Sequence, residues 1–133
     1  IPMLTDSGGN AGSQASTLVI RAMATHDIET SDWAKVVLKE ITVGLICGLA
    51  LGIVAFLKCY FFDKVGMQVS FIVGLTIVGI VVIAKTVGSL LPIVAEKFGA
   101  DPAIMASPLI STIVDSLSLI VYFNVARLMI PGL

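Results

Sequence analysis

Long apolar segments separated by short polar connectors dominate this sequence. Three such segments lie at 40–62, 69–97 and 103–131. Each is long enough to cross the hydrocarbon core of a bilayer, which takes about 20 helical residues. Only 13% of the residues are charged, against roughly 25% in soluble domains. The pattern predicts an all-α membrane protein, a polytopic bundle of transmembrane helices that forms one domain over 1–133.

A fourth helix is predicted over 1–24, although this segment is rich in small and polar residues. Gly8 and Gly12 form a GxxxG pair that Ser16 extends, and such small residues let membrane helices approach closely. Four side chains with oxygen atoms share another face: Asn10, Ser13, Gln14 and Thr17. The segment is therefore either a close-packed helix crossing or part of a pore wall, to which Gly8 and Gly9 could present backbone carbonyls.

The last apolar segment contains a carboxylate, Asp115. If it faced lipid, it would cost about 2.5–3.5 kcal/mol on insertion scales. At helical spacing it shares a face with four other residues: Ser107, Ser111, Ser118 and Tyr122. Pro108 has no N–H, so within a helix the carbonyl of Ile104 would be left free. Ligands made only of oxygen suit magnesium, calcium, manganese or sodium rather than copper or zinc. The stripe therefore indicates a path for a hard cation.

One carboxylate provides few ligands for a divalent ion, so the number of chains that contribute to the site matters. A C2 homodimer would bring two copies of Asp115 to a shared axis. Glycines at four-residue spacing also predict a helix-packing seam in the second segment: Gly44, Gly48 and Gly52.

Three charged residues leave alternatives open. Glu40 is either solvated at a helix end or adds negative charge to a pore mouth. Asp101 either caps the last helix or joins that mouth. Lys85 lies inside the third segment, and extension of its side chain to the lipid boundary is favoured over inward pairing with a carboxylate.

Other function classes find no support in the residues. The sequence contains no paired carboxylates in a plausible pocket, no phosphate-binding loop and no serine–histidine–aspartate set, so an enzyme is not expected. The single histidine, His26, is expected to be a solvated loop residue. The net charge of −1 implies no nucleic-acid partner. Cys47 and Cys59 would lie about 18 Å apart along one helix, too far for a disulfide.

Several motifs together resemble the MgtE family of bacterial magnesium channels. They are the stretch GGNAGSQAS from Gly8 to Ser16, the turn from Gly99 to Ala103, Ser107-Pro108-Leu109, and Asp115 ahead of the final helical stretch. The resemblance covers nearly the whole chain. It implies a homodimeric channel of the bacterial inner (cytoplasmic) membrane that passes Mg²⁺ passively. The segments 1–24 and 103–131 would line a pore at the dimer interface, and the connector 25–39 would lie in the cytoplasm.

The resemblance also implies roles for single residues. Asp115 would hold hydrated Mg²⁺ in the pore, helped by positions at Ser107, Ser111 and the backbone of Gly8, Gly9 and Asn10. Glu40 and Asp101 match acidic positions at the cytoplasmic mouth, where intracellular Mg²⁺ helps to close the channel. The family's cytoplasmic regulatory domains and first transmembrane helix have no counterpart in this sequence.

Three functions remain in competition. The first is a passive magnesium channel pore, with Mn²⁺ and Co²⁺ as further possible ions. The second is a cation-coupled secondary carrier of divalent cations, against which the lack of an evident inverted repeat counts mildly. The third is a non-conducting membrane scaffold whose small-residue seams only assemble helices.

Overall fold

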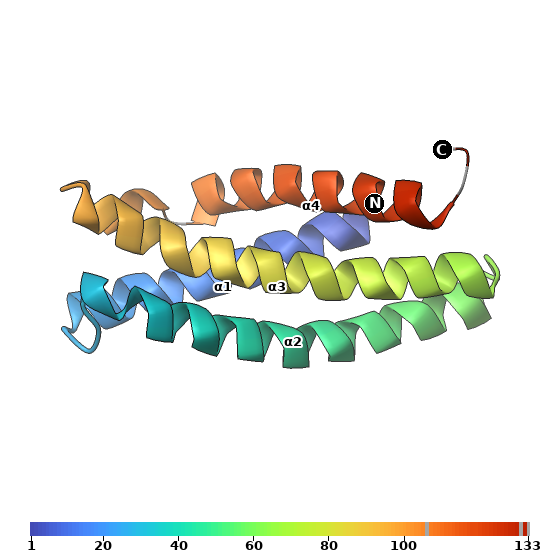
Figure 1. The fold of residues 1–133 in the computed structure, drawn as a ribbon, viewed down its shortest axis with the longest axis horizontal. Coiled ribbons are helices and arrows are strands. Elements are labelled where there is room, and N and C mark those ends of the chain that lie inside the picture. The colour runs from blue at the N-terminus through green and yellow to red at the C-terminus, as the bar shows by residue number, and fades with distance from the viewer. Residues whose placement is uncertain (106, 131, 133) are drawn as a thin grey trace.

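The computed structural model describes residues 1–105, 107–130 and 132, with only the backbone of residue 107. This part of the chain forms four α-helices and no strand (Figure 1): α1 (Pro2–Ala24), α2 (Trp33–Leu57), α3 (Met67–Lys97) and α4 (Ser107–Met129). The prediction of an all-α fold is confirmed.

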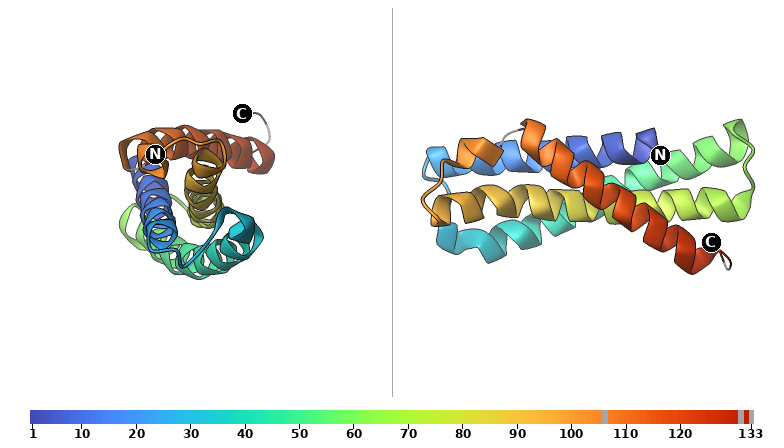
Figure 2. Two further views of the ribbon diagram at one scale, coloured as in Figure 1. Left: turned by 90° about the vertical axis from the view of Figure 1, so that its left-hand side faces the viewer. Right: turned by 90° about the horizontal axis from the view of Figure 1, so that it is seen from above.

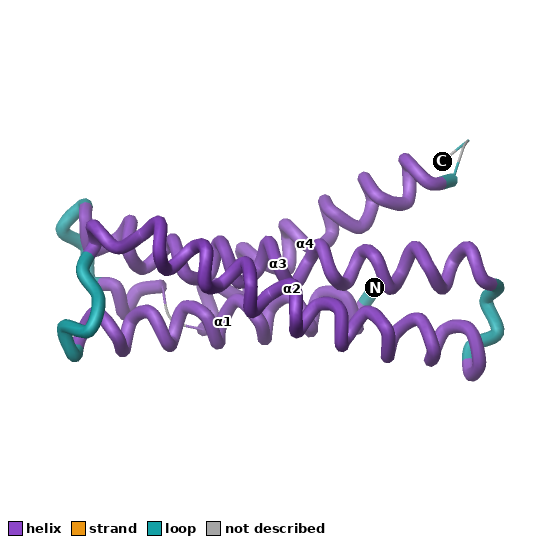
Figure 3. Tube along the Cα trace, turned by 60° about the horizontal axis from the view of Figure 1, so that its bottom comes forward, coloured by secondary structure: helices purple, strands orange, loops and turns teal. Residues whose placement is uncertain are grey.

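The helices run up and down, with α3 at the centre of the bundle. The α1–α2 and α3–α4 connectors lie at one end, and the α2–α3 turn lies at the other (Figure 1). α3 packs against α1, α2 and α4, and α1 also packs against α4. α4 crosses the bundle obliquely, as the view from above shows (Figure 2). Its C-terminal part diverges from the other helices (Figure 3).

Three of the helical segments are long and apolar enough to span a bilayer: Thr30–Phe62, Met67–Lys97 and Pro108–Met129. Large apolar side chains are exposed along the outside of α2, including Leu38, Leu45, Ile46, Leu49, Ile53 and Val54. A lipid environment would cover this surface.

α1 differs from the fourth span predicted over 1–24. It has 23 residues, enough to cross a bilayer, but it is not among the segments apolar enough to do so. Polar side chains account for this, and three of them are exposed in the single chain: Asn10, Gln14 and Thr17. At membrane depth this face needs water or another protein surface.

The second and fourth helices do not have the predicted bounds. α2 begins at Trp33 rather than at 40, because a 3₁₀ turn, η1 (Thr30–Asp32), leads directly into it. Asp32 accepts a hydrogen bond of 2.9 Å from the Glu29 N–H and so closes that turn. α2 then ends at Leu57 and continues as a π turn, η2 (Lys58–Phe62).

α4 begins at Ser107 rather than at 103, because a separate 3₁₀ turn, η3 (Pro102–Met105), precedes it. Pro108 therefore lies in the first turn of α4, where its missing N–H costs no helical hydrogen bond. Ile104 lies in η3 and Pro108 in α4, so the two residues do not belong to one helix as expected. The neighbouring carbonyl of Met105 accepts a hydrogen bond of 2.5 Å from the Ser16 hydroxyl on α1.

A seam of small residues joins α2 to α3. The glycines of α2 at four-residue spacing are all buried, and Gly44, Gly48 and Gly52 lie against Val82, Val78 and Gly74, respectively. A Cβ atom at Gly52 would lie only 2.8 Å from the carbonyl oxygen of Gly74. The two backbones therefore touch where only glycine fits.

A second close crossing joins α1 to α3, where Gly88 lies against the backbone of Gly12. The apolar core lies near this crossing, where α1, α3 and α4 meet. Its members include Leu4, Ile77, Ile80, Val81, Ile110 and Val114. This core fixes how α1 and α4 face each other.

Candidate functional site

The interface between α1 and α4 brings together polar atoms that are far apart in the sequence. The hydroxyl oxygens of Ser13 and Ser111 lie 3.2 Å apart. One turn away, Gly9 faces Asp115, and a Cβ atom at Gly9 would lie 3.1 Å from Asp115 Oδ1. The missing side chain at Gly9 thus leaves room for the carboxylate against α1.

The Asp115 carboxylate is half-buried in a helix apolar enough to span a membrane. Within the described part of the chain, no hydrogen bond or ion pair involves it. A charge removed from water needs compensation from a counter-charge or from donors. None of the described residues supplies either to Asp115, so the carboxylate is available to a cation.

Other members of the predicted stripe play different parts. Ser118 is buried, donates a hydrogen bond of 2.8 Å to the Val114 carbonyl, and packs against Gly8. Its hydroxyl is therefore engaged within α4. The side chain of Ser107 lies outside the described residues.

The backbone carbonyls predicted as ligands in α1 belong to a continuous helix. Gly8 and Gly9 are buried under α4, whereas Asn10 is exposed. All three lie inside α1, where carbonyls already accept helical hydrogen bonds. An ion would have to use the second lone pair of such a carbonyl, and these three positions stay predicted ligands.

The donor set of one chain is small. Among the described residues, no three or more His, Cys, Asp and Glu side chains group closely enough to hold a metal ion. One carboxylate with neighbouring hydroxyls fits an ion that keeps most of its water, as magnesium does. A second copy of the chain would double this set.

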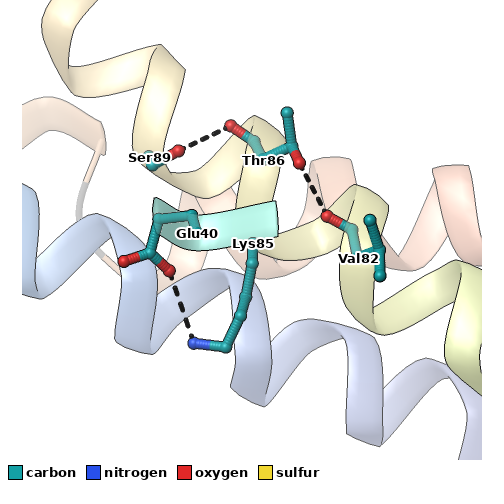
Figure 4. A network of polar contacts seen from close by, with 5 residues as sticks. All are labelled: Glu40, Val82, Lys85, Thr86 and Ser89. Atoms are coloured by element: carbon teal, nitrogen blue, oxygen red, sulfur yellow. Dashed lines mark hydrogen bonds and ion pairs between the residues drawn. The ribbon is translucent and has the colours of Figure 1, made fainter. Parts of the chain in front are cut away.

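A second polar site joins α2 to α3. Lys85 Nζ lies 3.5 Å from Glu40 Oε2, and the two side chains are 6% and 7% exposed, respectively. Figure 4 shows one carboxylate oxygen facing the ammonium group while the other points away. The favoured expectation that Lys85 extends to the lipid boundary is wrong, and the alternative of inward pairing with a carboxylate is confirmed.

Glu40 extends the glycine seam of α2 by one helical turn. Glu40 lies four residues before Gly44, so it occupies the same buried stripe of α2. Lys85 faces it from α3 and contacts the Gly44 position through Cδ. This spacing was visible in the sequence, but the partner of Glu40 depends on the register between the two helices.

A cavity of about 310 Å³ lies between α1 and α2 near their connector. Its charged lining residues are Asp27, Asp32, Lys35, Lys39 and Glu40. Asp101 is not among the lining residues. It is exposed on the α3–α4 connector, and its Oδ1 accepts a hydrogen bond of 3.0 Å from the Ala103 N–H. Asp101 thus caps the 3₁₀ turn η3 and not α4, which begins at Ser107.

Comparison with known proteins points to a single family. The family model MgtE, described as a divalent cation transporter, matches residues 1–125. A magnesium transporter MgtE of Thermus thermophilus is 42% identical over 132 residues, which cover 99% of this chain and 29% of the relative. The Enterococcus faecalis protein of that name is 30% identical, covering 96% of this chain and 28% of the relative. One from Bacillus subtilis is 28% identical, covering 100% and 29%. The chain therefore spans less than a third of each relative's length.

Proposed function

The chain belongs to the MgtE family and is an integral membrane protein, and from this we propose that it forms the conducting pore of a magnesium channel. The observation that carries the proposal is Asp115, a half-buried carboxylate with no partner among the described residues, on a helix apolar enough to span a membrane. The relatives are named for magnesium transport, which is a role other than catalysis.

In this proposal, α1 and α4 form the wall of the pore in a homodimer. Hydrated Mg²⁺ passes Asp115, and the hydroxyls of Ser13 and Ser111 bind its water shell. Two Asp115 carboxylates, one from each copy, balance the charge of the ion. The exposed polar face of α1 supports this arrangement, because it needs water or a partner at membrane depth.

The same proposal places a regulatory ion at the end of the bundle that carries the α1–α2 and α3–α4 connectors. Glu40 and Asp101 are acidic groups of this end. Intracellular Mg²⁺ bound there would favour the closed state by binding it more tightly than the open state.

Asp101→Asn separates this regulatory role from capping. Asparagine keeps a carbonyl oxygen that can accept the Ala103 N–H bond, and it caps as well as aspartate, but it lacks the charge. We expect the Mg²⁺ concentration for half-closure to rise about threefold or more, with an unchanged melting temperature. Unchanged closure would leave Asp101 with capping alone.

The proposed function is tested by Mg²⁺ flux into proteoliposomes at varied membrane potential, with no other ion gradient. A channel predicts flux that follows the potential. Flux that requires an added sodium or proton gradient would instead identify a coupled carrier. A folded dimer that passes no divalent ion under either condition would identify a scaffold.

A further inference from the structure

The Glu40–Lys85 pair is poorly built for holding the bundle together. Its N···O distance of 3.5 Å is long, and no donor among the described residues makes a hydrogen bond to Glu40 Oε2. A buried ion pair repays its desolvation only with close geometry and further hydrogen bonds. The pair therefore satisfies the carboxylate only in part.

Glu40 also has access to water-sized space, since it lines the cavity between α1 and α2. At about 310 Å³, this cavity has room for roughly ten waters at about 30 Å³ each. Asp27 and Asp32 add negative charge to its lining, which Lys35 and Lys39 partly offset. Glu40 therefore lines the cavity and also pairs with Lys85, which is not among the residues that line it.

We propose that Lys85 is a tethered cation that competes with a divalent cation for the Glu40 carboxylate. This inference rests on the proposed regulatory ion at Glu40 and adds what sets its affinity. An ion bound from the cavity repels the ammonium group, and the flexible Lys85 side chain withdraws from the carboxylate. Lys85 thereby raises the Mg²⁺ concentration at which the site fills.

Lys85→Gln tests this competition by removing the tethered charge. The purified chain is titrated with MgCl₂ while the fluorescence of Trp33 and the melting temperature are recorded. Trp33 is the only tryptophan and begins the helix that carries Glu40. Subtracting the response of the Glu40→Gln/Lys85→Gln double variant leaves the part of the response that depends on Glu40. For this part, we expect the Mg²⁺ concentration at half-saturation to be about tenfold lower in Lys85→Gln than in the wild type.

Lys97→Gln is the matched control, because Lys97 is an exposed lysine in the last turn of the same helix as Lys85 and does not line the cavity. It should shift half-saturation less than about twofold, since exposed charges are screened. If Lys85→Gln does not fold, Lys85→Arg gives the opposite test: its guanidinium can bind both carboxylate oxygens, and more Mg²⁺ should be needed.

The proposal is overturned if Lys85→Gln binds Mg²⁺ no more tightly than the wild type, or if the double variant keeps the whole response. A fall in melting temperature that Mg²⁺ does not restore would make the pair purely structural. These measurements do not depend on transport. If the chain binds Mg²⁺ as expected but does not conduct it, the proposed pore function is overturned, whereas the proposed competition at Glu40 stands.

Discussion

Asp115→Asn is expected to reduce potential-driven Mg²⁺ flux by about 10- to 100-fold while the bundle stays folded. Asparagine has nearly the same volume as aspartate, so the packing against Gly9 is kept, but the negative charge facing the ion is lost. Interactions with a charged group contribute about 1.5–3 kcal/mol, which corresponds to this range of binding constants. The measurement is initial flux into proteoliposomes beside the wild type, with protein content matched.

Asp63→Asn is the matched control for this prediction. Asp63 is exposed at the α2–α3 turn and pairs with Lys58 at 2.7 Å. Exposed pairs of this kind contribute little to stability, so the same chemical change there should leave flux close to that of the wild type. Equal flux in Asp115→Asn and the wild type would place the ion path elsewhere. Loss of the folded protein in Asp115→Asn would show that the carboxylate is structural.

Gly88→Ala is expected to destabilise the bundle more than any other alanine substitution at a glycine of α3. The new methyl group would overlap the carbonyl oxygen of Gly12, and its α-carbon is also too close. All of the atoms in conflict belong to the backbone of α1, so no side chain can rotate away. Overpacking of this kind costs about 1–3 kcal/mol, and the free energy of unfolding should fall by at least that amount.

Gly79→Ala provides the comparison on the same helix. There the nearest atom to a new Cβ would be a methyl carbon of Val121 at 3.8 Å, which is an ordinary contact. Alanine favours a helix over glycine by up to about 1 kcal/mol, so this variant should be as stable as the wild type or more stable. Thermal unfolding of both variants in the same detergent measures the difference. Equal stability of the two would show that the α1–α3 crossing can relax.

Much of the architecture follows from local sequence patterns. The apolar segments predicted membrane helices because a helix satisfies its own backbone groups where no water can. The four-residue glycine spacing predicted a packing seam on α2, since residues four apart lie on one face. The starts of α2 and α4 were predicted less well, because short turns such as η1 and η3 depend on single capping contacts that helical periodicity does not reveal.

The candidate site, too, was predictable from the sequence only in part. The residues of the chain alone predicted that Asp115 is a costly charge on an apolar helix and that small residues would bring helices close together. The packing of the helices against one another decided that Gly9 and Ser13 of α1 face Asp115 and Ser111 of α4. It also decided that Lys85 turns inward to Glu40. Helical periodicity specifies which residues share a face, whereas the partner of each face depends on how the helices pack and in which register, and this is set by the close glycine contacts and the apolar core.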